Sequence, residues 1–304
     1  MGIVLVTGAT GFIGGRVASR LTDRGESVRA IVRRASDGLA QLGIDQRDGG
    51  LEGLDDAAFD GVDRVVHVAA SFDGDLATAR AVNRDATRRL VELAVTHRVT
   101  RLVHVSTTAV YDQARLGDVV IDESAPLRTA ESLPSATGNA PPTYGVTKAE
   151  GESAVEEGRR HGLSAAIVRP PAVLGAGPTS TWGTRVPRNL LAGHGFARHP
   201  DSTYAWVHVD DLAEATLAAM DVDGDTTVNV VAGHETVGAY LRRVVDALPR
   251  PVTIPEVTDA PWRGSYTTDR LRDDLGLTPR FGFAEAMDEI AAWWQQDGMN
   301  ATEG

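Results

Sequence analysis

The chain has 304 residues, a net charge of −12 at pH 7 and no cysteine. This length fits one large α/β domain, alone or with a smaller appendage. The negative charge argues against nucleic acid or an anionic membrane as a partner, and the lack of cysteine excludes disulfides and thiolate metal sites. No apolar run approaches the ~20 residues of a membrane span and no signal peptide precedes the first strand, so we expect a cytoplasmic protein.

The first 34 residues follow the order strand, glycine-rich turn, helix, strand. A β-rich run precedes Gly8, Gly11 and Gly14, and helical periodicity and a second β-rich run follow them. This is the first half of a dinucleotide-binding fold. Gly8 allows the tight turn, Gly11 lets the backbone approach a pyrophosphate, and Gly14 lets the helix lie close to the sheet. The helix N-terminus then offers unpaired N–H groups to the phosphates.

The second strand runs straight into Arg33 and Arg34, and the next carboxylate is Asp37. NAD-binding versions of this fold carry an acidic residue at the strand end, which holds the ribose 2′-hydroxyl. A guanidinium suits a 2′-phosphate instead, both by charge and by bidentate geometry. Two ordinary surface arginines would also explain the pattern. We favour NADP(H) as the cofactor over NAD(H).

Strands and helices alternate along the following segments. Their patterns predict a loop with a short helix at 41–60, a buried strand at 64–68, a long helix at 75–97 and a strand at 101–105. The alternation predicts an α/β fold with a doubly wound parallel sheet of Rossmann type. Ala69 and Ala70 end the buried strand, where small side chains leave room for a cofactor in the crevice of the sheet.

Proline and glycine interrupt the segment 111–142, which we expect to be a loop across the crevice. A helix should follow, starting near Tyr144 and running to about His161. Tyr144 and Lys148 are four residues apart, so they share a helical face. An ammonium beside a phenol lowers the pKa of the tyrosine towards working pH. A catalytic role for the pair is favoured because the pair follows a glycine-rich cofactor motif and a strand that ends in serine and threonine.

These motifs resemble the extended short-chain dehydrogenase/reductases, also called the NAD-dependent epimerase/dehydratase family, over almost the whole chain. The resemblance rests on TGATGFIG at 7–14, HVAA at 67–70, STTAVY at 106–111, YGVTK at 144–148, RPPAVLGAG at 169–177 and WVHVDDLAEA at 206–215. The pattern is nearest to the dihydroflavonol-reductase-like ketoreductases, whose 2′-phosphate arginine matches Arg33. The expected layout is a Rossmann core at 1–169 and 206–232, with a smaller, discontinuous substrate-binding lobe at 170–205 and 233–304.

The resemblance implies catalytic and cofactor-binding roles for particular residues. Thr107 would hydrogen-bond the substrate oxygen, Tyr144 would be the general acid or base, and Lys148 would hold the nicotinamide ribose. Val173 would meet the nicotinamide carboxamide, beside a wall shaped by Pro170. The full expected cofactor set is Gly8, Thr10, Gly11, Phe12, Ile13, Gly14, Arg33, Arg34, Asp48, Val68, Ala69, Ala70, Ser106, Tyr144, Lys148, Pro170 and Val173.

Departures from the family's pattern argue against two of the reaction types that the family catalyses. Its nucleotide-sugar dehydratases place Asp-Glu after the active-site threonine, where this chain has Thr108 and Ala109, which cannot protonate a leaving hydroxyl. Its nucleotide-sugar epimerases usually carry an arginine for the diphosphate four residues before the histidine of HVDD, where this chain has Tyr204. A third departure concerns the adenine site, because Gly49 follows Asp48 where a hydrophobe is usual.

Four aromatic residues fall near the segment between the last two motifs: Trp182, Phe196, Tyr204 and Trp206. An aromatic-lined site suits an apolar or aromatic carbonyl compound, although core packing would explain at least half of them. We therefore predict an NADP(H)-dependent oxidoreductase that transfers hydride between nicotinamide and a small ketone or aldehyde, or the corresponding secondary alcohol. The alternatives are a nucleotide-sugar epimerase with tightly bound NAD and, less favoured, a non-catalytic dinucleotide sensor that regulates a partner.

No metal site is predicted. His194 and His199 lie five residues apart in a glycine-rich loop, without a carboxylate placed to complete a site. Three further histidines lie in or beside strand patterns, where a buried, hydrogen-bonded role is expected: His67, His104 and His208. A homodimer through the helices at 75–97 and 143–161 is expected by analogy with the family alone.

Overall fold

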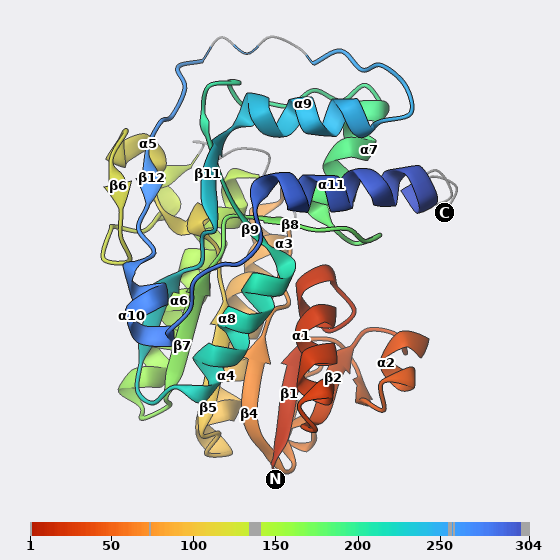
Figure 1. Cartoon of the computed structure of the whole chain (residues 1–304). Coiled ribbons are helices and arrows are strands. Elements are labelled where there is room, and N and C mark those ends of the chain that lie inside the picture. The colour runs from red at the N-terminus through yellow and green to blue at the C-terminus, as the bar shows by residue number, and fades with distance from the viewer. Residues whose placement is uncertain (1, 73, 134–140, 255–256, 258, 299–304) are drawn as a thin grey trace.

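The computed structural model describes residues 2–72, 74–133, 141–254, 257 and 259–298. Its central sheet has seven parallel strands in the order β10-β7-β5-β4-β1-β2-β3 (Figure 1). Their bounds are β1 Ile3–Thr7, β2 Ser27–Val32, β3 Asp45–Asp48, β4 Val62–His67, β5 Arg101–Val105, β7 Ala165–Arg169 and β10 Thr226–Asn229. The strand order reverses between β1 and β4, where open α/β sheets bind ligands beyond the carboxyl ends. The predicted Rossmann-type fold is confirmed.

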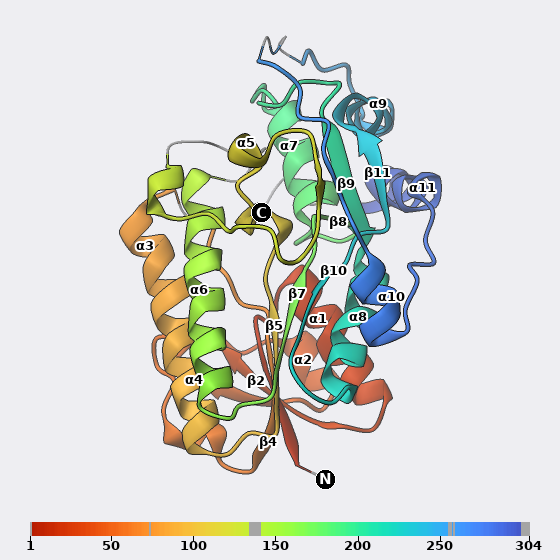
Figure 2. The ribbon, with the colours of Figure 1, turned by 90° about the vertical axis from the view of Figure 1, so that its left-hand side faces the viewer.

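Helices cover both faces of this sheet, which is why its central strands are almost continuously apolar. On one face, α1 (Phe12–Asp23) packs against α8 (Val209–Asp221). On the other, α4 (Thr87–Thr96) packs against α6 (Pro142–Arg160), as Figure 2 shows. Successive β1 residues point to opposite faces, so Val4 and Val6 join one core and Leu5 joins the other.

Three segments differ from the sequence-based expectation. Strand β3 forms at the edge of the sheet, where a loop with a short helix was expected, because its sequence DQRD has no hydrophobic residue to reveal a strand. The helix expected at 75–97 is α3 (Leu76–Arg80), a π-turn (Ala81–Ala86) and α4 in succession. The segment 111–142 contains α5 (Gln113–Leu116) and β6 (Val120–Ile121), and its residues 134–140 lie outside the described part of the chain.

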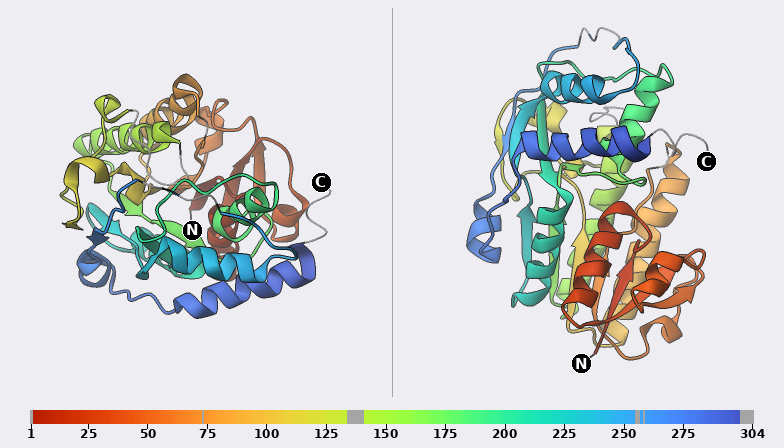
Figure 3. Two further views of the ribbon diagram at one scale, coloured as in Figure 1. Left: turned by 90° about the horizontal axis from the view of Figure 1, so that it is seen from above. Right: turned by 45° about the vertical axis from the view of Figure 1, so that its right-hand side comes forward.

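A three-stranded sheet stands above the carboxyl ends of the core strands. It has the order β11-β9-β8, with β8 Ala172–Leu174, β9 Thr203–His208 and β11 Gly233–Thr236. Three helices share its hydrophobic cluster: α7 Val186–Leu191, α9 Val237–Ala247 and α11 Phe283–Trp293. Seen from above in Figure 3, α9 and α11 lie side by side along its outer surface.

The elements do not follow the expected domain boundaries at two places. Strand β9 runs through residue 206, where the chain was expected to return to the core. Helix α10 (Asp269–Leu275) belongs to the range expected for the lobe, but its Leu271 and Leu275 pack into the core beside α8. The division into two domains stays a prediction. The remaining short elements are α2 Asp37–Gln41 and β12 Ser265–Tyr266. No helix in the described ranges is long and apolar enough to cross a membrane.

Candidate active site

The glycine turn between β1 and α1 has the shape of a phosphate cradle. Gly8 has φ +71°, and a Cβ atom on it would lie 2.8 Å from the Ala69 nitrogen. A Cβ atom on Gly14 would lie 2.2 Å from the Gly8 oxygen, so the helix starts directly on the turn. Gly11 is the N-cap of α1 and supplies no side-chain cap, which leaves the first N–H groups of the helix for an anion. These residues fit a dinucleotide.

The floor of the cradle is held by a buried hydrogen-bond chain. Thr7 Oγ1 lies 2.7 Å from His67 Nδ1 and accepts from the nitrogens of Val68 and Ala69 at 3.2 Å. His67 Nε2 lies 2.9 Å from Thr87 Oγ1. Burial lowers the pKa of His67 to about 3, and the Lys148 charge acts in the same direction. The neutral His67 therefore joins β1, β4 and α4 as a structural residue, and its predicted role is confirmed.

Arg33 and Arg34 follow β2 and are exposed, and neither forms an ion pair within the described residues. Asp48 ends the neighbouring β3 and is paired in register with Val32. Gly50 has φ +59°, and a Cβ atom on it would lie 3.0 Å from Arg33 Cγ. The glycine turn after Asp48 thus leaves room for the Arg33 side chain. The structure brings the two expected adenosine-side groups, Arg33 and Asp48, to adjacent strand ends.

Thr107 and Tyr144 meet at the carboxyl end of β5. The Ser106 and Thr108 nitrogens donate to the oxygens of Val168 at 2.7 Å and Pro170 at 2.9 Å, which fixes Thr107 between them. A Cβ atom on Gly145 would lie 2.2 Å from the Ala109 oxygen, so α6 begins against the turn after β5. The Thr107 side chain then lies beside the Tyr144 phenol and lowers its pKa, against the larger effect of burial.

Two members of the expected cofactor set, Ser106 and Val173, have contacts in the interior of the protein. The Ser106 hydroxyl donates to the buried Glu152, so the Ser106 side chain binds within the protein interior. Val173 lies on β8 and is buried against the core cluster. Phe12 lies against the loop at 175–177, because Cβ atoms on Gly175 and Gly177 would come within 3.0 and 3.5 Å of its ring.

Lys148 differs from the expectation. Its ammonium donates to the Val105 oxygen at 2.8 Å and lies 3.3 Å from His104 Nε2. Burial lowers the pKa of Lys148 to about 8. Burial also raises the pKa of Tyr144, and the groups acting in the opposite direction are Thr107 and Arg185. The prediction that Lys148 lowers the pKa of Tyr144 is therefore wrong for this structure, because desolvation dominates and Lys148 bonds to the strand backbone.

Two residues beside Tyr144 were missed. The Phe72 ring stacks on the Tyr144 ring with centroids 4.2 Å apart and an interplanar angle of 18°. Arg185 Cζ lies 5.2 Å from the centroid of Phe72. The sequence offered one indication that Phe72 lies near the site, because Phe72 directly follows the HVAAS segment at 67–71. Nothing in the sequence pattern pointed to Arg185.

The aromatic residues that were expected near a substrate site instead pack the upper lobe. Trp182, Phe196, Tyr204 and Trp206 all belong to the hydrophobic cluster of α9 and α11. Tyr204 is completely buried and stacks on Tyr240 with centroids 4.5 Å apart. Core packing thus accounts for these residues, and the argument from them to an aromatic substrate is wrong.

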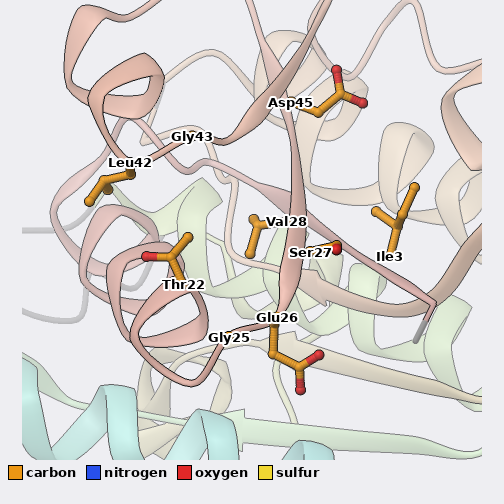
Figure 4. Close-up of a pocket in the computed structure, with 9 residues that line it drawn as sticks. All are labelled: Ile3, Thr22, Gly25, Glu26, Ser27, Val28, Leu42, Gly43 and Asp45. Atoms are coloured by element: carbon orange, nitrogen blue, oxygen red, sulfur yellow. The ribbon is translucent and has the colours of Figure 1, made fainter.

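A surface pocket lies at the amino-terminal ends of β1, β2 and β3 (Figure 4), whereas the glycine turn follows the carboxyl end of β1. It is lined by Ile3, Thr22, Gly25, Glu26, Ser27, Val28, Leu42, Gly43 and Asp45. Its carboxylates are already paired, Glu26 with Arg64 and Asp45 with Arg29, each at 2.7 Å. The described residues contain no group of three or more histidine or acidic side chains able to hold a metal. The prediction of no metal site stays a prediction.

A parallel Rossmann sheet, a glycine cradle at its switch point and a Thr107–Tyr144 pair at the neighbouring strand end define the class of nucleotide-dependent oxidoreductases. Residues 4–232 match the model of the NAD dependent epimerase/dehydratase family. The chain belongs to this family, the extended short-chain dehydrogenase/reductases, as predicted.

Relatives named for different reactions match this chain. Sterol demethylase protein B of Methylococcus capsulatus is 30% identical over 97% of this chain and 99% of its own. A 4-hydroxy-2-methyl-3-oxo-4-farnesyl-3,4-dihydroquinoline-1-oxide ketoreductase of Stigmatella aurantiaca is 33% identical over 58% of this chain and 51% of its own. The solved structure of MoeE5 with UDP-glucose and NAD superimposes with a TM-score of 0.80, at 25% identity over 97% of this chain and 99% of that one. Relatives named as dehydratase and epimerase also match.

Proposed function

We propose that this protein is an NADP(H)-dependent reductase of a small ketone or aldehyde, or the dehydrogenase of the corresponding alcohol. The observation that carries the proposal is the placement of Thr107 beside Tyr144, next to the dinucleotide cradle. Among the described residues, the groups that shift the pKa of Tyr144 include no carboxyl group, and Thr108 and Ala109 stand where a dehydratase needs its acid and base. The site is thus equipped for one proton transfer, as carbonyl reduction requires.

The residues of the site have separate tasks in this reaction. When bound, the nicotinamide supplies the hydride to the carbonyl carbon or takes it back. Tyr144 gives its phenolic proton to the carbonyl oxygen, and Thr107 donates a hydrogen bond to the charge developing there. Burial keeps the pKa of Tyr144 above its ordinary value, so the acid is protonated at neutral pH. Lys148 would hold the nicotinamide ribose, and Phe72 offers an apolar wall next to the phenol.

The cofactor preference rests on Arg33. Arg33→Ala should weaken NADPH binding about ten- to a hundredfold and leave NADH nearly unchanged, because a charged hydrogen bond to phosphate is worth about 1.5–3 kcal/mol. Fluorescence titration with both nucleotides measures this. Arg242→Ala, which removes another exposed arginine on α9, should change neither affinity. Equal weakening of both nucleotides, or a wild-type preference for NADH, would show that Arg33 does not select a 2′-phosphate.

A nucleotide-sugar epimerase is the second candidate, favoured by the similarity to MoeE5 in complex with UDP-glucose and NAD. Against it, Tyr204 occupies the position of the expected diphosphate arginine and is buried in the lobe. We therefore expect calorimetric titration with UDP, dTDP or GDP to show no binding below millimolar concentration. A micromolar dissociation constant for any of the three would make the epimerase the better assignment.

The expected partners and location of the protein stay predictions. These are a homodimer, a cytoplasmic location and the lack of a nucleic-acid or membrane partner. A silent dinucleotide sensor stays the least favoured alternative, because it has no need of a Thr107–Tyr144 pair.

A further inference from the structure

A charged residue of the upper lobe acts on the proposed general acid. Arg185 ends the π-turn Thr181–Arg185 that precedes α7, and its Cζ lies 5.2 Å from the centre of the Phe72 ring. Phe72 is itself stacked on Tyr144. The charge of Arg185 also lowers the pKa of Tyr144, against the larger effect of burial. The charge of Arg185 therefore acts on the phenol of Tyr144, and its side chain contacts the ring that stacks on Tyr144.

The charge of Arg185 is not neutralised by the described part of the protein. Its side chain is exposed, and no described carboxylate forms an ion pair with it. Arg33 and Arg34, which we expect to face the cofactor, likewise form no ion pair within the described residues, whereas Arg24 lies 2.9 Å from Asp221 and Arg80 lies 2.6 Å from Glu150. In a chain of net charge −12, an arginine beside the active site without such a partner is available for a carboxylate that the substrate brings.

We propose that Arg185 binds a carboxylate group of the substrate, so that the protein reduces keto acids to hydroxy acids. A single guanidinium matches a singly charged planar carboxylate through two parallel hydrogen bonds. Phe72 is 41% exposed and supplies apolar surface for the part of the substrate between the carboxylate and the carbonyl. The product keeps the carboxylate, and its carbonyl group becomes an alcohol by gaining a hydride from the reduced nicotinamide at carbon and the Tyr144 proton at oxygen. This inference rests on the proposed reductase function and names its substrate class.

The test compares 4-acetylbenzoate with its methyl ester, because the two share the ketone and the ring and differ in charge. Wild type should favour the acid in kcat/KM with NADPH. Arg185→Gln should lose about 10–100-fold on the acid and less than about twofold on the ester, since it removes a charge-assisted pair. Arg185→Lys should recover part of the loss, and the remote Arg242→Gln should change neither substrate. Equal losses on acid and ester would overturn the proposal.

Binding of benzoate, which has no ketone to reduce, separates this proposal from the reductase assignment. In calorimetric titrations of the NADP⁺-loaded protein, benzoate should bind wild type about tenfold or more tightly than Arg185→Gln, whereas benzamide should bind both alike. If neither ketone is reduced but benzoate shows this difference, the reductase assignment is wrong and the carboxylate site stands. If the ketones are reduced and benzoate does not distinguish the two proteins, the carboxylate site is wrong.

Discussion

Replacing Tyr144 with phenylalanine should lower kcat for ketone reduction about 10²–10⁴-fold, while the affinity for NADPH barely changes. The variant removes the proton donor but keeps the ring that stacks on Phe72 at 4.2 Å. It also keeps all the residues of the glycine cradle. Thr107→Ala should lose less, because one donor to the oxyanion remains. Single-turnover reduction of a reactive aromatic ketone, followed by NADPH absorbance, gives these rates directly.

Tyr240→Phe is the matched control for Tyr144→Phe. Tyr240 is also completely buried, and its hydroxyl donates to the Trp182 oxygen at 2.6 Å in the upper lobe. Its loss should leave kcat unchanged. The wild-type reduction rate should also stay flat through neutral pH, because the raised pKa of Tyr144 keeps the acid protonated. Near-wild-type turnover by Tyr144→Phe would mean that the proton comes from another donor.

The core of the fold was readable because its determinants are local. The roles of Gly8 and Gly14 could be predicted because a short turn between a strand and a helix needs glycine at these positions. Strands β4 and β5 could be predicted because each is a short apolar run between turns. Strand β3 was not readable, since DQRD carries no apolar period and is a strand only through its pairing with β2. Edge strands of this kind are set by the partner strand and not by their own sequence.

Only part of the candidate site could be predicted, because only some of its residues lie in local sequence motifs. Thr107 and Tyr144 lie in short motifs with characteristic spacing, so their meeting could be predicted. Phe72 and Arg185 come from distant segments. The stacking of Phe72 on Tyr144 and the position of Arg185 over the Phe72 ring depend on tertiary packing that no local pattern contains. Helical spacing placed Lys148 on the face of Tyr144, but it contained no information on the β5 backbone that binds the ammonium.

Glu152→Gln should lower the free energy of unfolding by about 3–5 kcal/mol, because it leaves a buried guanidinium without its counter-charge. Glu152 accepts from Arg169 Nε at 3.0 Å and Nη2 at 2.6 Å, and both side chains are buried. It also accepts from the Ser106 hydroxyl at the end of β5. Arg169 has further partners in the Tyr111 hydroxyl and the Glu123 oxygen, so it cannot turn to solvent without breaking them. Urea denaturation at pH 7 measures the loss.

Glu150→Gln tests whether burial sets this cost. Glu150 lies two residues earlier on α6 and pairs with Arg80 at 2.6 Å, but both side chains are about one quarter exposed, at 23% and 26%. Water screens such a pair, so its loss should cost less than about 1 kcal/mol. Replacing both buried charges, as Glu152→Leu with Arg169→Met, should be less harmful than Glu152→Gln, since no uncompensated charge remains. Similar losses for Glu150→Gln and Glu152→Gln would show that the interior pair is solvated, and the Arg169 network would then contribute no more than a surface ion pair.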